Sequence, residues 1–257
     1  MISWNNALLL LLLLQSVGNQ GNLVVARPRM GSTRTYPPPT TAPSSNSSSP
    51  SLAFSLSPTP STLPSSAPSY SLPALHPANL TFLAFGDWGL PGENQSAVAG
   101  LMASYASAFG ANFVVSLGDN FYEDGVSSDI DPLWYEAYTS VYDAASLQIP
   151  WYTVLGNHDY HLNPEAQIDY YKNRRDDRWV MPSHLYSQAW QIPGSSEYLE
   201  IVFVDTDILY PGGTPQTASG GIHEVSDQTV DAAYQELENL LSNSVARWLI
   251  VAGHYTG

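Results

Sequence analysis

Four short apolar runs in this chain end in the same way, and that repeated junction constrains the fold more than any other feature. Each run is rich in valine, isoleucine or aromatic residues, which is typical of strands buried on both faces of a sheet. A glycine and then a polar residue follow at once, at Gly86-Asp87, Gly118-Asp119, Gly156-Asn157 and Gly253-His254. Glycine lets the backbone turn sharply there. Because ligand sites in α/β sheets lie at the carboxyl ends of strands, the four turns are expected to converge on one point.

Each junction also has a purely structural interpretation. A single Gly-Asp after a strand is usually only a turn, and an isolated histidine is more often a hydrogen-bonded core residue than a ligand. Four polar residues at the same register of four strand ends are harder to explain as independent turns. A shared metal site is therefore the favoured interpretation.

Apolar runs and helical patterns alternate along residues 79–257, which predicts one α/β layered domain. Strands are expected at 81–85, 113–117, 151–155, 199–204 and 248–252. Helices are expected at 94–109, 133–142, 164–174 and 228–241.

The composition narrows the chemistry of the site. The formal net charge is -15, and all 23 acidic residues lie in residues 80–257. A domain this acidic repels nucleic acid and anionic membranes, so no nucleic-acid partner is expected. The chain contains no cysteine, which excludes disulfides, a thiol nucleophile and thiolate metal sites. Any metal must therefore bind to His, Asp, Glu, Asn or Tyr.

The N-terminus is typical of an export signal. Residues 7–14 form an apolar run that is too short to span a membrane but matches a signal peptide, so no stable membrane span is expected. Residues 1–26 are predicted to be the signal, cleaved after Ala26, with cleavage near Gly18 as an alternative. The leader before the run contains no Lys or Arg, and an N-terminal helix packed on the domain is the other interpretation.

Residues 27–78 are dominated by Ser, Thr and Pro, which predicts a disordered linker and leaves residues 79–257 as the domain. In an exported protein this linker would be a plausible O-glycosylated stalk. Sequons for N-glycosylation begin at Asn46, Asn79 and Asn94, although each is weak evidence alone. The protein is therefore expected to be secreted, or vacuolar or lysosomal, with possible N- and O-linked glycans.

The ligand types suggest what the metal would do. Carboxylates, an amide oxygen and imidazole suit Fe, Mn or Zn, and two such ions can clamp a phosphate ester for in-line attack. Asp119 lies in the middle of the constellation, where a bridging carboxylate is needed. Tyr122 follows three residues later, and a phenolate ligand favours a ferric ion. Taken alone, Tyr122 would more simply be a half-buried aromatic residue.

The blocks GDWG, GDNFY, GNHDY and VAGHY resemble, in order and spacing, those of the calcineurin-like metallophosphoesterases. More narrowly, they resemble the small purple (tartrate-resistant) acid phosphatases, which Tyr122 distinguishes from most of the superfamily. The resemblance implies an α-β-β-α sandwich and a secreted enzyme that hydrolyses phosphate monoesters, with a small phosphorylated molecule as the substrate.

The resemblance also implies a role for each site residue. Asp87 and Tyr122 would bind a first, ferric ion, and Asp119 would bridge. Asn157 and His254 would bind a second ion, which would be Fe(II), Zn or Mn.

Around the phosphate, Asn157 and His158 would contact the substrate. His158 would protonate the leaving alkoxide, a role that an imidazole can also fill on chemical grounds at acidic pH. Asp159 either orients a neighbouring side chain or is a simple turn carboxylate. His161 is expected to be a surface residue.

One block of the family pattern is missing from these 257 residues. A Gly-His-x-His block should supply one histidine to each metal, and Thr256 stands where the family has proline. The expected sandwich is thus incomplete at its C-terminus, and strand 248–252 is expected to have an open apolar edge. Two alternatives to the phosphatase follow, a catalytically impaired exported binding protein and a phosphodiesterase, although Tyr122 argues against the second.

Overall fold

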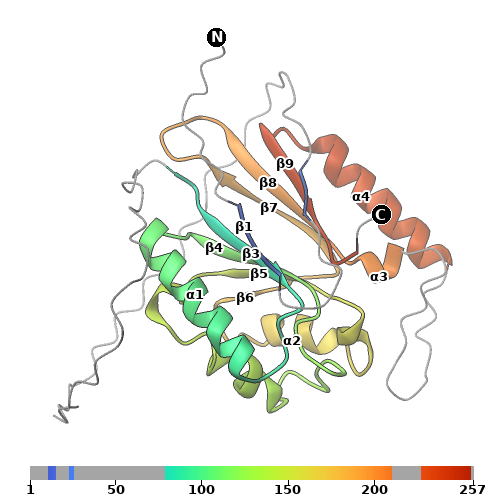
Figure 1. Cartoon of the computed structure of the whole chain (residues 1–257). Helices are drawn as coiled ribbons and strands as arrows, with labels where there is room; N and C mark the ends of the chain where they lie inside the picture. The colour runs from blue at the N-terminus through green and yellow to red at the C-terminus, as the bar shows by residue number, and fades with distance from the viewer. Residues whose placement is uncertain (1–10, 16–22, 26–78, 210–226, 256–257) are drawn as a thin grey trace, which may run out of the picture. The chain divides into compact units, whose positions relative to one another are not determined.

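The computed structural model describes residues 11–15, 23–25, 79–209 and 227–255 (Figure 1). These residues form two β-sheets whose inner faces pack on each other. Helix α1 (Glu93–Phe109) covers the outer face of one sheet, and α4 (Asp227–Asn243) covers the outer face of the other. The predicted α-β-β-α arrangement is confirmed.

The first sheet carries three of the four predicted turns. Four of its strands run parallel in the order β3 (Phe82–Gly86), β4 (Phe113–Leu117), β5 (Trp151–Val154) and β6 (Trp179–Val180). β3, β4 and β5 agree with the predicted strands within one residue at each end. Because parallel strands end at the same edge of a sheet, the turns that follow them are neighbours.

The second sheet carries the fourth turn. It contains β7 (Leu185–Gln191), β8 (Tyr198–Val204) and β9 (Trp248–Ala252), with β7 antiparallel to β8 and β9 parallel to β8. β7 and β6 were not predicted from the sequence. β7 begins with buried Leu185 and Tyr186 but continues with half-buried residues, several of them polar, so it is not a continuous apolar run and lacks the signal that marked the other strands.

Short segments of the expected signal peptide lie in the sheets. β1 (Leu11–Gln15) pairs in parallel with β3, and β2 (Leu23–Val25) pairs antiparallel with β9. The edge of β9, which was expected to be open, is therefore occupied by β2 in this structure. The other residues of 1–26, and all of the linker expected at 27–78, lie outside the described residues, so the signal and the linker stay predictions.

The remaining helices lie largely where the sequence places them. The segment expected at 133–142 is a shorter π-helix, η1 (Trp134–Thr139), and the helix expected at 164–174 is α2 (Glu165–Lys172). Short helices occur at η2 (Ala145–Leu147), η3 (His158–Tyr160) and α3 (Thr206–Leu209).

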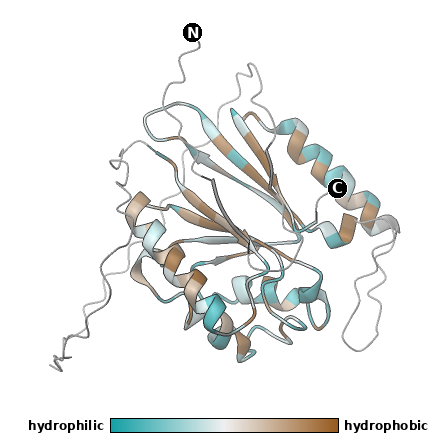
Figure 2. Ribbon diagram, in the orientation of Figure 1, coloured by the Kyte–Doolittle hydropathy of each residue, from teal (hydrophilic) through white to brown (hydrophobic). Residues whose placement is uncertain are grey.

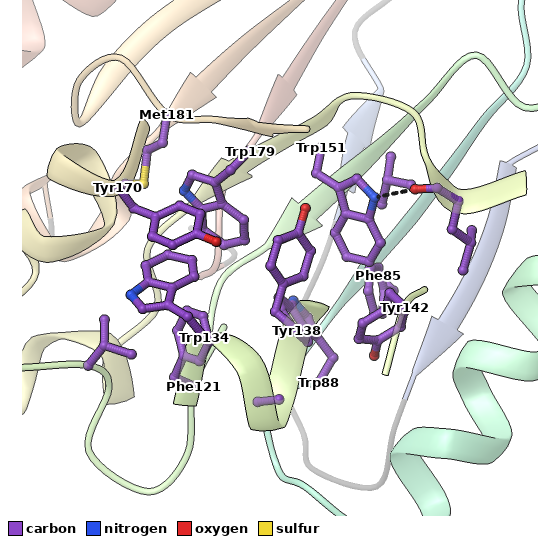
Figure 3. Close-up of a cluster of buried hydrophobic side chains, with 14 of the residues drawn as sticks. Phe85, Trp88, Phe121, Trp134, Tyr138, Tyr142, Trp151, Tyr170, Trp179 and Met181 are labelled. Atoms are coloured by element: carbon purple, nitrogen blue, oxygen red, sulfur yellow. Dashed lines mark hydrogen bonds between the residues drawn. The ribbon is translucent and has the colours of Figure 1, made fainter. Parts of the chain in front are cut away.

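Hydrophobic residues concentrate in the strands of both sheets (Figure 2). One core lies between the sheets, and a second, largely aromatic core lies between the first sheet and α1 (Figure 3). Ring contacts connect four tryptophans in this aromatic core: Trp88, Trp134, Trp151 and Trp179. Among the described residues, no helix is both long and apolar enough to cross a membrane.

Candidate metal centre

The four predicted turns do converge, but they come from two sheets and not from one. Asp87, Asp119 and Asn157 follow β3, β4 and β5 of the first sheet, whereas His254 follows β9 of the second. His254 reaches across to the first sheet, where its Nδ1 lies 2.9 Å from the carbonyl oxygen of Leu117. The site therefore lies where the two sheets meet at the carboxyl ends of their strands.

The backbone at two of these turns adopts a conformation that L-residues rarely adopt. Asp87 has φ 57° and Asp119 has φ 52°, both in the left-handed region. Non-glycine residues in that region carry a conformational cost and cluster at functional sites. The surrounding packing must therefore hold both carboxylates in place.

Glycine is required where the turns touch each other. A Cβ atom on Gly156 would lie 2.3 Å from the backbone nitrogen of Asp119, and one on Gly118 would lie 2.8 Å from Nδ1 of His254. Any larger residue at either position would push these candidate ligands apart. The glycines thus allow the ligand turns to approach closely.

The hydroxyl of Tyr122 donates to Oδ2 of Asp119 at 2.7 Å and to Oδ1 of Asp87 at 3.1 Å. Burial raises the pKa of Tyr122 well above its usual value, and hydrogen bonding to Asp119 together with both negative charges raises that pKa further. Burial also raises the pKa of Asp87. Without a cation, the phenol therefore keeps its proton and shares it between the two carboxylates.

The second half of the site brings three acceptor atoms together. Nε2 of His254 lies 3.2 Å from Oδ1 of Asn157 and 3.5 Å from Oδ1 of Asp119. Because Nδ1–H of this ring donates to the Leu117 carbonyl, Nε2 directs its lone pair at the two oxygens. Such an orientation, fixed by a hydrogen bond from the other ring nitrogen, is typical of metal-binding histidines.

These residues fit a metal ion on chemical grounds. Asp87, Asp119 and His254 each offer one ligand atom, and these atoms all lie within 4.8 Å of one another. Asp119 and His254 are buried, and buried acceptor atoms that face one another are unfavourable unless a proton or a cation lies between them. A mixed set of oxygen and nitrogen donors suits Fe, Zn or Mn.

His158 lies beside the site, and one of its ring nitrogens is fixed by a hydrogen bond. Its Nδ1 lies 2.6 Å from the carbonyl oxygen of Glu123, which fixes a proton on Nδ1 and leaves Nε2 for other contacts. Its ring centroid is 4.5 Å from that of Tyr122, and its backbone N–H donates to Asp119 at 3.0 Å.

His161 is not the simple surface residue that was expected. Its side chain is 19% exposed, its Nδ1 lies 3.1 Å from Oδ1 of Asp124, and its ring centroid is 4.9 Å from that of His158. It therefore packs against His158 beside the candidate site.

A second titratable cluster lies near the site and was not predicted. His184 contacts Asp205 through Nδ1 and Glu165 through Nε2, both at 2.7 Å, and the hydroxyl of Tyr160 donates to Asp205 at 2.6 Å. Burial alone would lower the pKa of His184, but the two carboxylates raise it to about 9. No sequence motif joins these residues, which are up to 45 positions apart.

Residues 80–257 match the family model described as calcineurin-like phosphoesterase. The chain is 38% identical over 192 residues to purple acid phosphatase 3 of Arabidopsis thaliana, which covers 72% of this chain and 50% of that protein. It is 33% identical over 183 residues to tartrate-resistant acid phosphatase type 5 of Oryctolagus cuniculus, which covers 68% of this chain and 56% of that protein. The chain thus spans about half the length of the curated relatives it matches.

A solved structure shares the fold. It is described as GAP50, the anchor in the inner membrane complex of Plasmodium, and matches with a TM-score of 0.56 and 26% identity over 67% of this chain and 53% of that one.

Proposed function

This chain belongs to the calcineurin-like phosphoesterase family, in its purple acid phosphatase branch, and we propose that it hydrolyses phosphate monoesters at a dinuclear metal centre. The observation that carries the proposal is the convergence of the Asp87–Tyr122–Asp119 cluster with His254 and Asn157 at one edge of the two sheets.

In this proposal Asp87 and Tyr122 would hold a ferric ion, Asn157 and His254 would hold Fe(II), Zn or Mn, and Asp119 would be a ligand of both. The contact of Tyr122 with both carboxylates supports the first group, and the three facing acceptor atoms support the second. When bound, the ions would supply Lewis-acid polarisation of the phosphate ester.

His158 is the proposed general acid, and with Asn157 it would contact the phosphate. The Glu123 carbonyl holds the proton on Nδ1, so Nε2–H of the protonated ring is the group that can donate to the leaving alkoxide oxygen. Such a donor acts only while Nε2 carries a proton.

We further propose export, either to the extracellular space or to a vacuole or lysosome, with possible N- and O-linked glycans. The apolar run at 7–14 and the Ser/Thr/Pro-rich stretch support this proposal. The acidity of the domain disfavours nucleic acid as a partner.

The direct test is hydrolysis of p-nitrophenyl phosphate at acidic pH by the iron- and zinc-loaded protein. Asp119→Asn should abolish turnover because it removes the bridging carboxylate. Asp129→Asn is the matched control, since Asp129 pairs with Arg175 at the surface, away from the four turns. Equal turnover of both variants and the parent would contradict the proposal.

A second candidate is a protein of this fold that binds a partner and does not catalyse. This candidate is favoured by the description of the solved relative as an anchor. Under this alternative the metal-loaded chain shows no hydrolysis, and Asp119→Asn leaves partner binding unchanged.

A further inference from the structure

Asp159 has a set of hydrogen bonds that a simple turn carboxylate does not need. The side chain is fully buried, with 0% exposure. Its oxygens accept backbone N–H groups from Asn120 at 3.0 and 3.1 Å, from Phe121 at 3.2 Å and from Gly156 at 2.9 Å. The side-chain amide of Gln167 donates to it at 2.7 Å.

These donors come from two different ligand turns. Asn120 and Phe121 lie between Asp119 and Tyr122, whereas Gly156 directly precedes Asn157. One carboxylate therefore joins the turn after β4 to the turn after β5. The two turns are already in close contact at Gly156, and Asp119 is held in the left-handed region, so their backbones need such a connection.

The network extends to the third turn through the side chain of Asn120. Its Nδ2 donates to the oxygen of Gln167 at 3.0 Å and to the Val154 carbonyl at 2.7 Å, and its Oδ1 accepts from Nε1 of Trp88 at 3.1 Å. Trp88 directly follows Asp87. Three of the four ligand turns are thus linked to one buried carboxylate.

We propose that Asp159 is a positioning residue of the metal centre, which holds the ligand turns in register through their backbone N–H groups and touches neither metal nor substrate. The proposal rests on the proposed function. A carboxylate is required because both oxygens must accept, whereas an amide offers one acceptor oxygen and turns an NH₂ group toward other N–H donors.

The test begins with the metal-free protein and Asp159→Asn. Hydrogen exchange at the amide of Phe121 or of Gly156 should become at least tenfold faster, because these two N–H groups donate to different oxygens of Asp159 and an NH₂ group replaces one of those oxygens. Zinc affinity, measured by titration calorimetry, should fall by about 10–100-fold, which is typical of losing a group that orients metal ligands.

Glu200→Gln is the matched control. Glu200 is also a buried carboxylate, in β8, where it accepts from Ser187 at 2.8 Å and from Ser244 at 2.6 Å. Its neutralisation should lower the melting temperature without changing zinc affinity. Glu200→Gln shows how much zinc affinity changes when a buried carboxylate is lost away from the site. Asp159→Asn must lower zinc affinity by more than this amount.

A double variant in which Asp159 and Gln167 exchange carboxylate and amide, the swapped pair, distinguishes the effect of the backbone contacts of Asp159 from the effect of its contact with Gln167. Asp159→Asn combined with Gln167→Glu keeps one carboxylate in the cluster and restores an amide–carboxylate hydrogen bond, but it returns no second acceptor to the turns. Zinc affinity should therefore stay low. If Asp159→Asn does not fold, amide hydrogen exchange and zinc affinity are both measured on the double variant instead.

The outcomes separate the two proposals. Restored affinity in the swapped pair, unchanged amide exchange, or faster exchange with parental zinc affinity would each overturn the role of Asp159. If the parent protein takes up no zinc, the proposed function fails, and the exchange comparison still decides whether Asp159 holds the turns.

Discussion

At the residue scale, Tyr122 is the side chain whose loss should be most visible. Tyr122→Phe removes the hydroxyl shared by Asp87 and Asp119 but keeps the ring. We expect the iron-loaded variant to lack the visible charge-transfer absorption of a ferric phenolate while its circular dichroism stays that of the parent. Tyr105→Phe, on α1, is the control and should keep the colour. A coloured Tyr122→Phe protein would rule out this ligand.

Gly156 and Gly100 offer a matched pair of glycine-to-alanine changes. In Gly156→Ala the new methyl group would lie 2.3 Å from backbone and side-chain atoms of Asp119, whereas in Gly100→Ala it meets nothing within 4 Å. We expect Gly156→Ala to lower the free energy of unfolding by about 1–3 kcal/mol, as overpacking does. Gly100→Ala should be stabilising by about 0.5–1 kcal/mol, because alanine favours a helix interior. Equal effects in urea denaturation would contradict the packing of the two ligand turns.

His184 should make stability depend on pH. Its pKa is raised to about 9 in the folded protein, above the usual value, so its contribution is complete below about pH 6.5 and is lost as pH rises toward 9. The contribution is at most about 3 kcal/mol. The difference in melting temperature between the parent and His184→Gln should therefore shrink from pH 6 to pH 9. A difference that stays constant would show that the charge of this imidazole does not matter.

At the element scale, β3 and β9 each pair on one side with a short edge strand. β1 and β2 cover their edges, and both partners lie within the predicted signal peptide. We expect residues 27–257, produced without the first 26 residues, to aggregate more than the full chain, because unpaired apolar edges recruit other strands. Size-exclusion chromatography with light scattering measures this. Monomeric behaviour at high concentration would show that these edges are protected in another way.

Sequence alone was sufficient for the strands that carry the site and for the ends of those strands. The apolar runs before Asp87, Asp119 and His254 mark β3, β4 and β9 because each strand is buried on both faces. The division of the strands into two sheets could not be predicted from the sequence, because an apolar run indicates a strand but not the strand with which it pairs.

Contacts between distant residues were also beyond the sequence. Asp159 was left open between two roles because its donors are up to 39 positions away, and the cluster around His184 had no motif at all. Local sequence patterns predict where a side chain lies on its own strand, helix or turn. They do not predict which backbone groups of other elements it contacts.

At the scale of the whole molecule, metal and stability should be coupled. In the proposed centre, Asp87, Asp119 and Tyr122 would hold one ion, and Asp119, Asn157 and His254 would hold the other. We therefore expect bound metal to stabilise the folded chain, because its ligands come together only when the strands are in place. Excess zinc should raise the melting temperature, by an amount that grows with the logarithm of zinc concentration.

A melting temperature independent of zinc would show that the four turns do not form a cation site.

The aromatic core beneath the first sheet has an optical consequence. Trp88 directly follows Asp87, and ring contacts join it to Trp151 at 5.8 Å and, through Phe121, to Trp134 and Trp179 (Figure 3). Excitation absorbed by any of these indoles can pass between them and reach the one beside the site. A coloured, paramagnetic ferric ion there would quench the emission of the whole group. Tryptophan fluorescence would therefore report iron occupancy of the proposed centre without an added dye.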